Sequence, residues 1–285
     1  MARNEYFTLA QIDEVAQQIR SRIPSGRAPT QPSVGMILGS GLGALAEAVT
    51  QPVNISYSQL PYWPIPSVEG HKGQLVIGQL EDQDVLIMQG RTHFYEGISM
   101  AEVGLPVRVM QRLGVKIVIV TNAAGAVNQD FQPGDLMLIT DHINLLGMAG
   151  NSPLRGPNLD ELGARFPDMS QAYDRQLMEI TRQVAKEQGI QLRQGVYICL
   201  AGPSFESPAD LRFLRAIGVD AVGMSTVPEV IVARHGGQRV LGFSGISNKA
   251  NLNGNTITTH EEVLEAGKVI APKLTALLKG VLSRL

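Results

Sequence analysis

Arginine, histidine and tyrosine occur at alternate positions in one short segment of this chain. Arg91, His93 and Tyr95 lie between Gly90 and Gly97, so in an extended backbone they would project to one side. A guanidinium offers a planar fork of charged donors that suits phosphate oxygens, and an imidazole orients or exchanges protons near neutral pH. An isolated loop arginine is ordinarily a solvated surface charge, but this spacing around an aromatic residue favours an anion site.

A glycine-rich segment, Val34–Gly43, ends an apolar run and precedes a helix-prone segment, Ala44–Val49. Glycine lets a backbone approach a ligand closely, and the N–H groups that begin a helix attract an anion, to which Ser40 adds a hydroxyl. The segment also fits a loose dinucleotide-binding pattern, but Tyr57–Pro66 lacks the carboxylate that such a site needs. We expect a phosphate cradle here; a turn without function and an NAD-dependent dehydrogenase are the alternatives.

A carboxylate and a side-chain amide follow two further predicted strands. Glu206 comes after the strand expected over 195–200, and Asn248 comes after the one expected over 240–246. By residue type alone, Glu206 could be a carboxylate at the start of a helix and Asn248 a turn residue. Their position just past strand ends favours a ligand-facing role, because ligands of α/β sheets bind there.

The elements that must position these residues alternate between apolar strands and helices, which predicts an α/β protein. We expect a single domain, residues 1–285, with a central mixed, largely parallel β-sheet flanked by helices. Capping residues begin helices at Thr8, Ser99, Ser207 and Thr259, whereas 51–69 is expected to be a packed loop and 121–126 a turn. Further strands are expected over 34–38, 75–80, 85–88, 116–120, 136–140 and 221–224.

The bulk composition excludes several classes of protein. The 285 residues are 44% apolar with a net charge of −2, which indicates a globular chain without an extended nucleic-acid footprint. Cys199 is the single cysteine, so a disulfide framework or a thiolate zinc site is not expected. The start of the chain lacks an apolar signal core and no apolar run has the length of a membrane span, so a cytoplasmic location is expected.

From Val34 to Gly267 the sequence resembles the purine nucleoside phosphorylases of the low-molecular-mass, typically trimeric class. The resemblance rests on motifs in a fixed order: Leu-Gly-Ser-Gly-Leu-Gly at 38–43, Gly-His at 70–71, Gln-Gly-Arg-Thr-His-Phe-Tyr-Glu-Gly at 89–97, Thr-Asn-Ala-Ala-Gly at 121–125, Ala-Gly-Pro-Ser-Phe-Glu at 201–206, Val-Gly-Met-Ser-Thr-Val-Pro-Glu at 222–229 and Ser-Asn-Lys at 247–249. It implies reversible phosphorolysis of inosine, guanosine and their deoxy forms to a free base and (deoxy)ribose 1-phosphate. Orthophosphate would be a co-substrate, and no cofactor or metal is implied.

The resemblance also assigns residues to three subsites. Phosphate would meet Ser40, His71, Arg91, His93, Ala123 and Ser225; ribose would meet Tyr95, Met224 and His260; the base would meet Ala123, Gly125, Phe205, Glu206, Met224, Asn248 and Val263. Asn248, Glu206 and His93 are the expected catalytic residues. Whether His71 and His93 transfer protons or only orient phosphate is left open.

Hydrogen-bond chemistry agrees with the assigned base site. A Glu206 carboxylate accepts from N1–H of a 6-oxopurine, and the Asn248 amide donates to O6 and N7. A 6-aminopurine mismatches this pair, so inosine and guanosine should be preferred over adenosine. A xanthosine-accepting enzyme, a methylthioadenosine-type phosphorylase (which would carry Asp at 248) and a nucleoside-binding protein without turnover are the alternatives.

The resemblance implies a homotrimer, and a related branch includes hexamers. In trimeric relatives an aromatic residue from the neighbouring subunit covers the sugar, and Leu162 occupies that place here. Either Leu162 forms a weaker apolar lid or another residue takes that role.

Overall fold

The computed structural model describes residues 5–24, 32–255 and 259–285, with the side chain of His260 left out. The elements, in chain order, are α1 (Leu9–Ser21), β1 (Val34–Leu38), β2 (Thr50–Ser56), β3 (Gln74–Leu80), β4 (Gln83–Gln89), α2 (Met100–Leu113), β5 (Ile117–Ala126), β6 (Leu136–Ile143), α3 (Leu145–Met148), α4 (Arg175–Glu187), β7 (Leu192–Cys199), α5 (Pro208–Ala216), β8 (Ala221–Gly223), α6 (Val227–His235), β9 (Arg239–Lys249) and α7 (His260–Leu282). Short 3₁₀ helices span Gly43–Ala48, Tyr57–Gln59 and Phe94–Glu96.

The strands form one mixed sheet in the order β2-β3-β4-β1-β5-β8-β7-β6-β9. Strand β9 also pairs with β5, so the strands β5, β8, β7, β6 and β9 close into a ring. Strand β5 runs parallel to β1 and β9 and antiparallel to β8. This is the single-domain α/β architecture with a mixed sheet that the sequence predicts.

Strands β5 and β9 contain an irregularity next to the polar residues. Ala124 lies opposite Ile246, but Gly125 lies opposite Asn248, so Ser247 is one extra residue on β9. Such a bulge bends a strand and changes the direction of the side chains around it.

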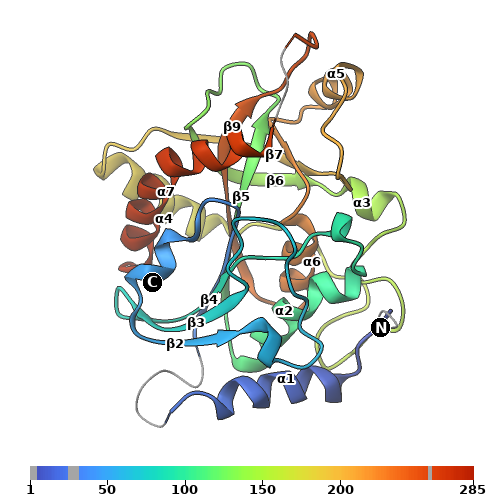
Figure 1. Cartoon of the computed structure of the whole chain (residues 1–285), viewed down its shortest axis with the longest axis vertical. Coiled ribbons are helices and arrows are strands. Elements are labelled where there is room, and N and C mark those ends of the chain that lie inside the picture. The colour runs from blue at the N-terminus through green and yellow to red at the C-terminus, as the bar shows by residue number, and fades with distance from the viewer. Residues whose placement is uncertain (1–4, 25–31, 256–258) are drawn as a thin grey trace.

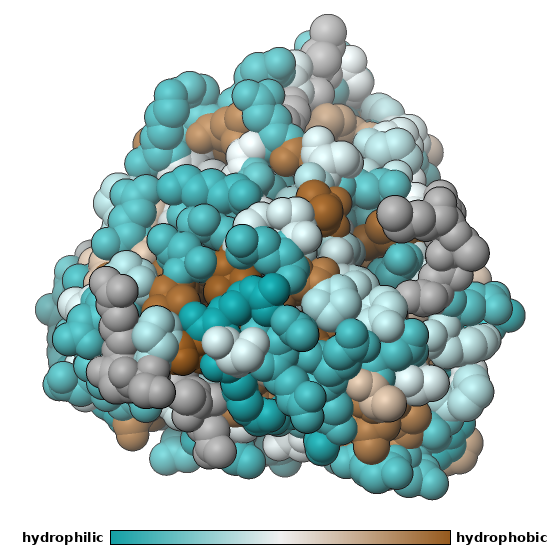
Figure 2. Space-filling view, turned by 60° about the horizontal axis from the view of Figure 1, so that its bottom comes forward, coloured by the Kyte–Doolittle hydropathy of each residue, from teal (hydrophilic) through white to brown (hydrophobic). Residues whose placement is uncertain are grey.

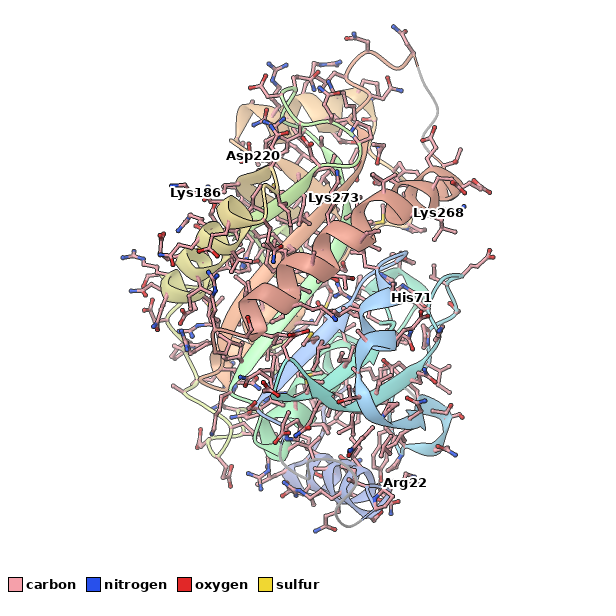
Figure 3. All side chains as sticks on the ribbon, turned by 90° about the vertical axis from the view of Figure 1, so that its left-hand side faces the viewer. Arg22, His71, Lys186, Asp220, Lys268 and Lys273 are labelled. Carbon is pink, nitrogen blue, oxygen red and sulfur yellow. The ribbon has the colours of Figure 1, made fainter. Side chains whose placement is uncertain are left out.

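Helices cover both faces of the sheet (Figure 1). Helices α4 and α7 lie on one side, with α7 crossing the strands in Figure 3, and α1, α2 and α6 lie on the other. The helices that cover the sheet bury apolar residues against it, as α1 does with Ile12, Val15, Ala16 and Ile19 at helical spacing. Capping boxes at Thr8, Ser99, Ser207 and Thr259 begin α1, α2, α5 and α7 as predicted.

Three expectations about local structure are wrong. The segment 51–69 contains most of strand β2, which pairs with β3 despite its proline. Residues 121–126 are not a turn, because β5 continues to Ala126 against β9. The segment after the glycine loop forms a 3₁₀ helix, Gly43–Ala48, so no α-helix begins there.

Candidate active site

A cavity of about 320 Å³ lies beside strands β5, β8 and β9. It collects most residues that the sequence assigns to a site: Ser40, Arg91, His93, Tyr95, Ala123, Gly125, Phe205, Glu206, Met224, Ser225, Asn248 and Val263. These residues come from segments far apart in the chain, and the ring of strands brings them together. The cavity is also lined by residues that the sequence did not single out: Gly39, Val68, Asn122, Ala124, Pro203, Val222, Gly223 and Ser247.

Of the assigned residues with a described side chain, His71 is not among the lining residues of this cavity. Its Nε2 is 3.1 Å from the Oγ of Ser40, so it contacts the expected phosphate side through that hydroxyl. His260 begins helix α7, but its side chain is outside the described part of the structure.

The glycine loop supports the cavity differently from our expectation. The N–H of Gly39 donates to Oγ1 of Thr121 at 3.0 Å, so it is used by the protein. A Cβ at Gly39 would lie 2.8 Å from Cα of Asn122, which shows that glycine is required for the close approach of β1 to β5. A 3₁₀ helix of six residues follows the loop in place of an α-helix, and Gly39 and Ser40 of the loop line the cavity. The phosphate cradle itself stays a prediction.

Arg91 is 2% exposed and lies at the end of β4, beneath the cavity. Its Nη1 donates to Oγ of Ser225 at 2.9 Å and to Oγ1 of Thr226 at 2.8 Å. Its Nη2 donates to the carbonyl oxygens of Ile37 and Thr121, at 3.1 and 2.7 Å. The buried cation therefore reaches the cavity wall mainly through the hydroxyl of Ser225.

The carboxylate of Glu229, itself 4% exposed, lies 3.4 Å from Nε of Arg91. A buried arginine needs such a counter-charge, because an unpaired buried charge is costly. In the sequence, Glu229 is visible only as a glutamate in the first turn of α6, and nothing in the sequence points to its pairing with Arg91.

His93 is oriented by a carboxylate that the sequence analysis did not select. Its Nδ1 lies 2.9 Å from Oε1 of Glu96, while its ring stacks on Tyr95 at 4.7 Å between centroids. With Nδ1 occupied, Nε2 is the nitrogen left for a ligand. Burial alone raises the pKa of Glu96, but hydrogen bonds from His93 and Ser67 outweigh it and lower this pKa to about 2, so the carboxylate is ionised. The spacing His93-x-x-Glu96 was the available signal, since it forms a capping box.

Tyr95, which the sequence assigns to ribose, lines the same cavity. Burial and the nearby Glu96 carboxylate raise the pKa of its phenol to about 12, in spite of the opposing Arg91. The hydroxyl therefore keeps its proton at neutral pH, as a donor to a sugar oxygen would require.

The lining of the cavity also includes an acceptor and a donor group, on Glu206 and Asn248. Burial, and to a lesser degree the charge of Asp210, raise the pKa of Glu206 above its ordinary value. The Oγ of Ser247 donates to Oδ1 of Asn248 at 2.8 Å, and Nδ2 of Asn248 donates to the carbonyl oxygen of Lys249 at 3.4 Å, which leaves one amide N–H for a ligand. Acceptor and donor thus line one cavity wall, as the sequence predicted.

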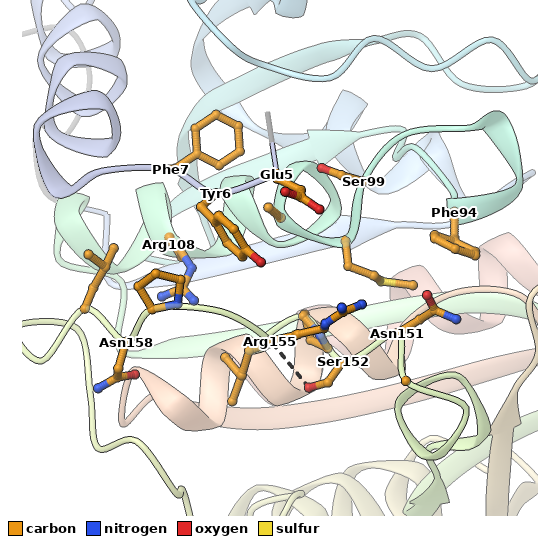
Figure 4. Close-up of a pocket in the computed structure, with 17 residues that line it drawn as sticks. Glu5, Tyr6, Phe7, Phe94, Ser99, Arg108, Asn151, Ser152, Arg155 and Asn158 are labelled. Atoms are coloured by element: carbon orange, nitrogen blue, oxygen red, sulfur yellow. Dashed lines mark hydrogen bonds between the residues drawn. The ribbon is translucent and has the colours of Figure 1, made fainter. Parts of the chain in front are cut away.

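A second cavity, of about 210 Å³, lies between the start of the chain and the loop 150–159 (Figure 4). Tyr6, Phe7, Arg108 and Arg155 line it, and none of the residues assigned to phosphate, ribose or base does. It shares no lining residue with the first cavity among the described parts of the chain. The first cavity is therefore the candidate active site.

One cavity of this α/β fold is thus lined by a buried arginine with serine hydroxyls and by a carboxylate and an amide. Residues 33–283 match the family model described as the phosphorylase superfamily. The chain belongs to this family, and its relatives bear the name purine nucleoside phosphorylase.

The similarity to named relatives covers nearly the full chain. Purine nucleoside phosphorylase 1 of Geobacillus stearothermophilus is 51% identical over 95% of this chain and 96% of its own. Purine nucleoside phosphorylase 1 of Bacillus subtilis is 53% identical over 90% of this chain and 93% of its own. The Schistosoma mansoni purine nucleoside phosphorylase in complex with inosine is 40% identical, with a TM-score of 0.92 over 98% of this chain and 97% of that one.

Proposed function

We propose that the protein catalyses the reversible phosphorolysis of 6-oxopurine (deoxy)ribonucleosides. The observation that carries this proposal is one cavity that Ser40, His93 and Ser225 line together with Glu206 and Asn248. A nucleoside between these ends would have its sugar carbon C1′ within reach of a bound anion. The relatives named above support the same reaction class.

In this reaction an oxygen of orthophosphate forms a bond to C1′ as the bond from C1′ to the purine nitrogen breaks. The bonding electron pair leaves with the purine, and the sugar passes through an oxocarbenium-like state. Positive charge thus develops on the sugar and negative charge on the departing purine. Hydrogen-bond donors to the phosphate and to the purine therefore stabilise the transition state. His93, held by Glu96, is suited to bind or protonate a phosphate oxygen.

Asn248 is the residue we assign to the leaving group. Donation from its amide to N7 strengthens as negative charge moves onto the purine, so it favours the transition state over the ground state. Burial raises the pKa of Glu206, and no ion pair of its carboxylate occurs among the residues that the structure describes, so a purine N1–H would supply it with a donor. These two contacts together favour a 6-oxopurine over a 6-aminopurine.

The structures of relatives define what must be tested about specificity. Schistosoma mansoni purine nucleoside phosphorylase has been solved in complex with adenosine as well as with guanosine. Asparagine at position 248 argues against a methylthioadenosine-type enzyme, in which we expect aspartate. Xanthosine stays a second candidate substrate beside inosine and guanosine. Steady-state rates on inosine, guanosine, xanthosine and adenosine, each with and without phosphate, decide between these substrates.

The same assay tests the reaction itself. We expect base release from inosine and guanosine only when phosphate is present. Asn248→Ala should lower kcat for inosine by about 10²-fold or more, the scale of losing one transition-state donor. Binding of nucleosides without any phosphate-dependent base release would instead identify a nucleoside-binding protein.

We also propose that the protein assembles as a homo-oligomer, a trimer or a hexamer. Phe166 is 87% exposed and Met148 is 75% exposed, and the surface seen in Figure 2 is mostly hydrophilic with separate hydrophobic patches. Leu162 is 2% exposed within the core of its own chain, so in this structure it does not reach the surface to cover a neighbour's sugar. Phe166, four residues later, is the apolar candidate for that contact, and the mass in solution tests the assembly.

The expectations of no metal or cofactor and of a cytoplasmic location stay predictions. Hydrogen-bond donors and the charge of Arg91 supply what the proposed reaction needs at both ends of the cavity. Within the described residues, no helix has the length and apolar character to cross a membrane.

A further inference from the structure

Thr226 has a backbone conformation that threonine rarely adopts. Its φ is 75° and its ψ is −53°, and the N–H of Val227 donates to the carbonyl oxygen of Ser225 at 2.8 Å. This is the rare, strained form of γ-turn, and a β-branched side chain makes it costlier still. Strain of this kind persists only where the surrounding structure holds it, and it concentrates at functional sites.

The side chain of Thr226 does not perform the usual task of its position. Thr226 is the N-cap of α6, where a threonine hydroxyl ordinarily accepts a bond from the first turn of the helix. In the described structure its hydroxyl makes no such bond and turns toward Arg91 and Asn122 instead. The Thr226 hydroxyl thus forms these contacts in place of a helix cap, and its backbone keeps the strained conformation.

The hydrogen bonds of the Thr226 hydroxyl fix the direction of its own proton. Its Oγ1 accepts from Nη1 of Arg91 at 2.8 Å and from Nδ2 of Asn122 at 2.9 Å. A hydroxyl has two acceptor positions and one donor. With both acceptor positions filled, its proton is left for the Oγ of Ser225, which lies 3.2 Å away.

The same counting applies to Ser225. Its Oγ accepts from Nη1 of Arg91 at 2.9 Å and then from the hydroxyl of Thr226. Both acceptor positions are filled, so the Ser225 proton is directed to a further acceptor, and Ser225 lines the cavity. Ser225 is thereby set as a donor toward the cavity, with the positive charge of Arg91 behind it.

We propose that Thr226 is a positioning residue that fixes Ser225 as a hydrogen-bond donor to the anion. Through it, the charge of Arg91, whose terminal N–H groups are engaged with protein atoms, acts on an oxyanion in the cavity. The inference rests on the proposed function, in which that anion is orthophosphate.

The test replaces Thr226 by valine, which keeps the shape and removes the hydroxyl. Thr226→Val should raise the Kd of inorganic phosphate, measured by titration calorimetry, by about 10- to 100-fold, the range for a hydrogen bond to a charged group. The KM for phosphate should rise in parallel, while the Kd of hypoxanthine stays within about twofold of wild type. Thr226→Ser keeps the hydroxyl and should restore phosphate binding to within about threefold.

Two further variants separate positioning from folding. Thr226→Gly removes the same hydroxyl while relaxing the γ-turn, so it should lose phosphate affinity even if the valine variant fails to fold. Thr181→Val is the matched control, because Thr181 is equally buried but donates to Leu177 within α4, and it should bind phosphate as wild type does.

Wild-type phosphate affinity in a folded Thr226→Val or Thr226→Gly protein overturns the inference, as does equal weakening of phosphate and hypoxanthine. Serine that fails to restore phosphate binding overturns it too. Calorimetry does not depend on turnover, so a wild-type protein that binds phosphate without releasing base from inosine refutes the proposed function and leaves this inference standing.

Discussion

The Oγ of Ser247 lies 2.8 Å from Oδ1 of Asn248, and the two residues are consecutive on strand β9. The same hydroxyl lies 3.2 Å from the carbonyl oxygen of Ala124 on β5. The single proton of the Ser247 hydroxyl is thus shared between two acceptors, the nearer of which is Oδ1 of Asn248, and this contact holds the amide oxygen on the side of Ser247.

Removal of this hydroxyl should reduce the selectivity of the base site. In Ser247→Ala the amide of Asn248 loses its fixed orientation, so kcat/KM for inosine should fall by about tenfold, the scale of one hydrogen bond. The ratio of adenosine to inosine turnover should rise, because a rotated amide presents its oxygen to a 6-amino group. Steady-state kinetics on both nucleosides measure this. Ser33→Ala, which removes a hydroxyl near Asp84 on β4, is the control; an unchanged adenosine-to-inosine ratio in Ser247→Ala would contradict the orienting role.

The Glu206 carboxylate, which we propose as the acceptor for a purine N1–H, should reduce the stability of the ligand-free protein. Its pKa is raised in the folded state, so ionisation above its ordinary value of 4.5 favours the unfolded chain. Glu206→Gln should therefore melt at a higher temperature than wild type at neutral pH, and the difference should disappear as the pH falls below that value. The same variant should lose turnover of guanosine. Melting curves across pH check the first statement, and equal melting temperatures at neutral pH would refute it.

The ionised carboxylate of Glu96 should stabilise the folded protein, in contrast to that of Glu206. Its folded pKa is lowered to about 2 from an ordinary 4.5, so its stabilising contribution is complete above the ordinary value and is lost as the pH falls toward the folded one. Glu96→Gln should therefore be less stable than wild type near neutral pH, with a gap that narrows between these two values. It should also lower kcat, because Nδ1 of His93 loses its carboxylate. A stability gap that does not change with pH would show that this ionised carboxylate is not the cause.

Gly39 and Gly43 make a matched pair for the glycine loop. A Cβ at Gly39 would approach Cα of Asn122 to 2.8 Å, whereas a Cβ at Gly43 would meet nothing closer than the side chain of Gln89 at 3.6 Å. Gly39→Ala should destabilise the protein by about 1–3 kcal/mol, as overpacking does, and weaken phosphate binding by displacing Ser40. Gly43→Ala should change neither property appreciably. Urea unfolding and calorimetry with phosphate compare them; equal stabilities for the two variants would contradict the close-packing explanation.

Much of the fold and of the cavity lining could be predicted from the sequence. The capping boxes at Thr8 and Ser99 depend on neighbours three residues away, so local pattern is sufficient to find them. Strand β2 was missed because its exposed, proline-containing pattern gives little periodicity, and only pairing with β3 makes it a strand. The 3₁₀ helix after Gly43 was mistaken for an α-helix because composition does not distinguish the two.

The site residues that sequence reasoning missed act through other residues. Thr226 and Glu229 contact Arg91, while Asn122, which lines the cavity, donates to Thr226; these partners are distant in the chain. Their roles cannot be recognised from residue type, because these roles depend on burial in the folded chain and on the strained turn at Thr226. Glu96 is the exception, since its spacing from His93 was visible.

The unpaired residue on β9 has a consequence for how this pocket can change. Because Ser247 is the extra residue of the bulge, a chain without it would keep Asn248 opposite Gly125 and Lys249 opposite Ala126 in an uninterrupted ladder. It would lose the local bend of the strand and the hydroxyl beside the Asn248 amide. A single codon deletion would thus straighten the strand under the amide without changing the residue that faces Gly125, whereas a point substitution at 247 would leave the bend in place.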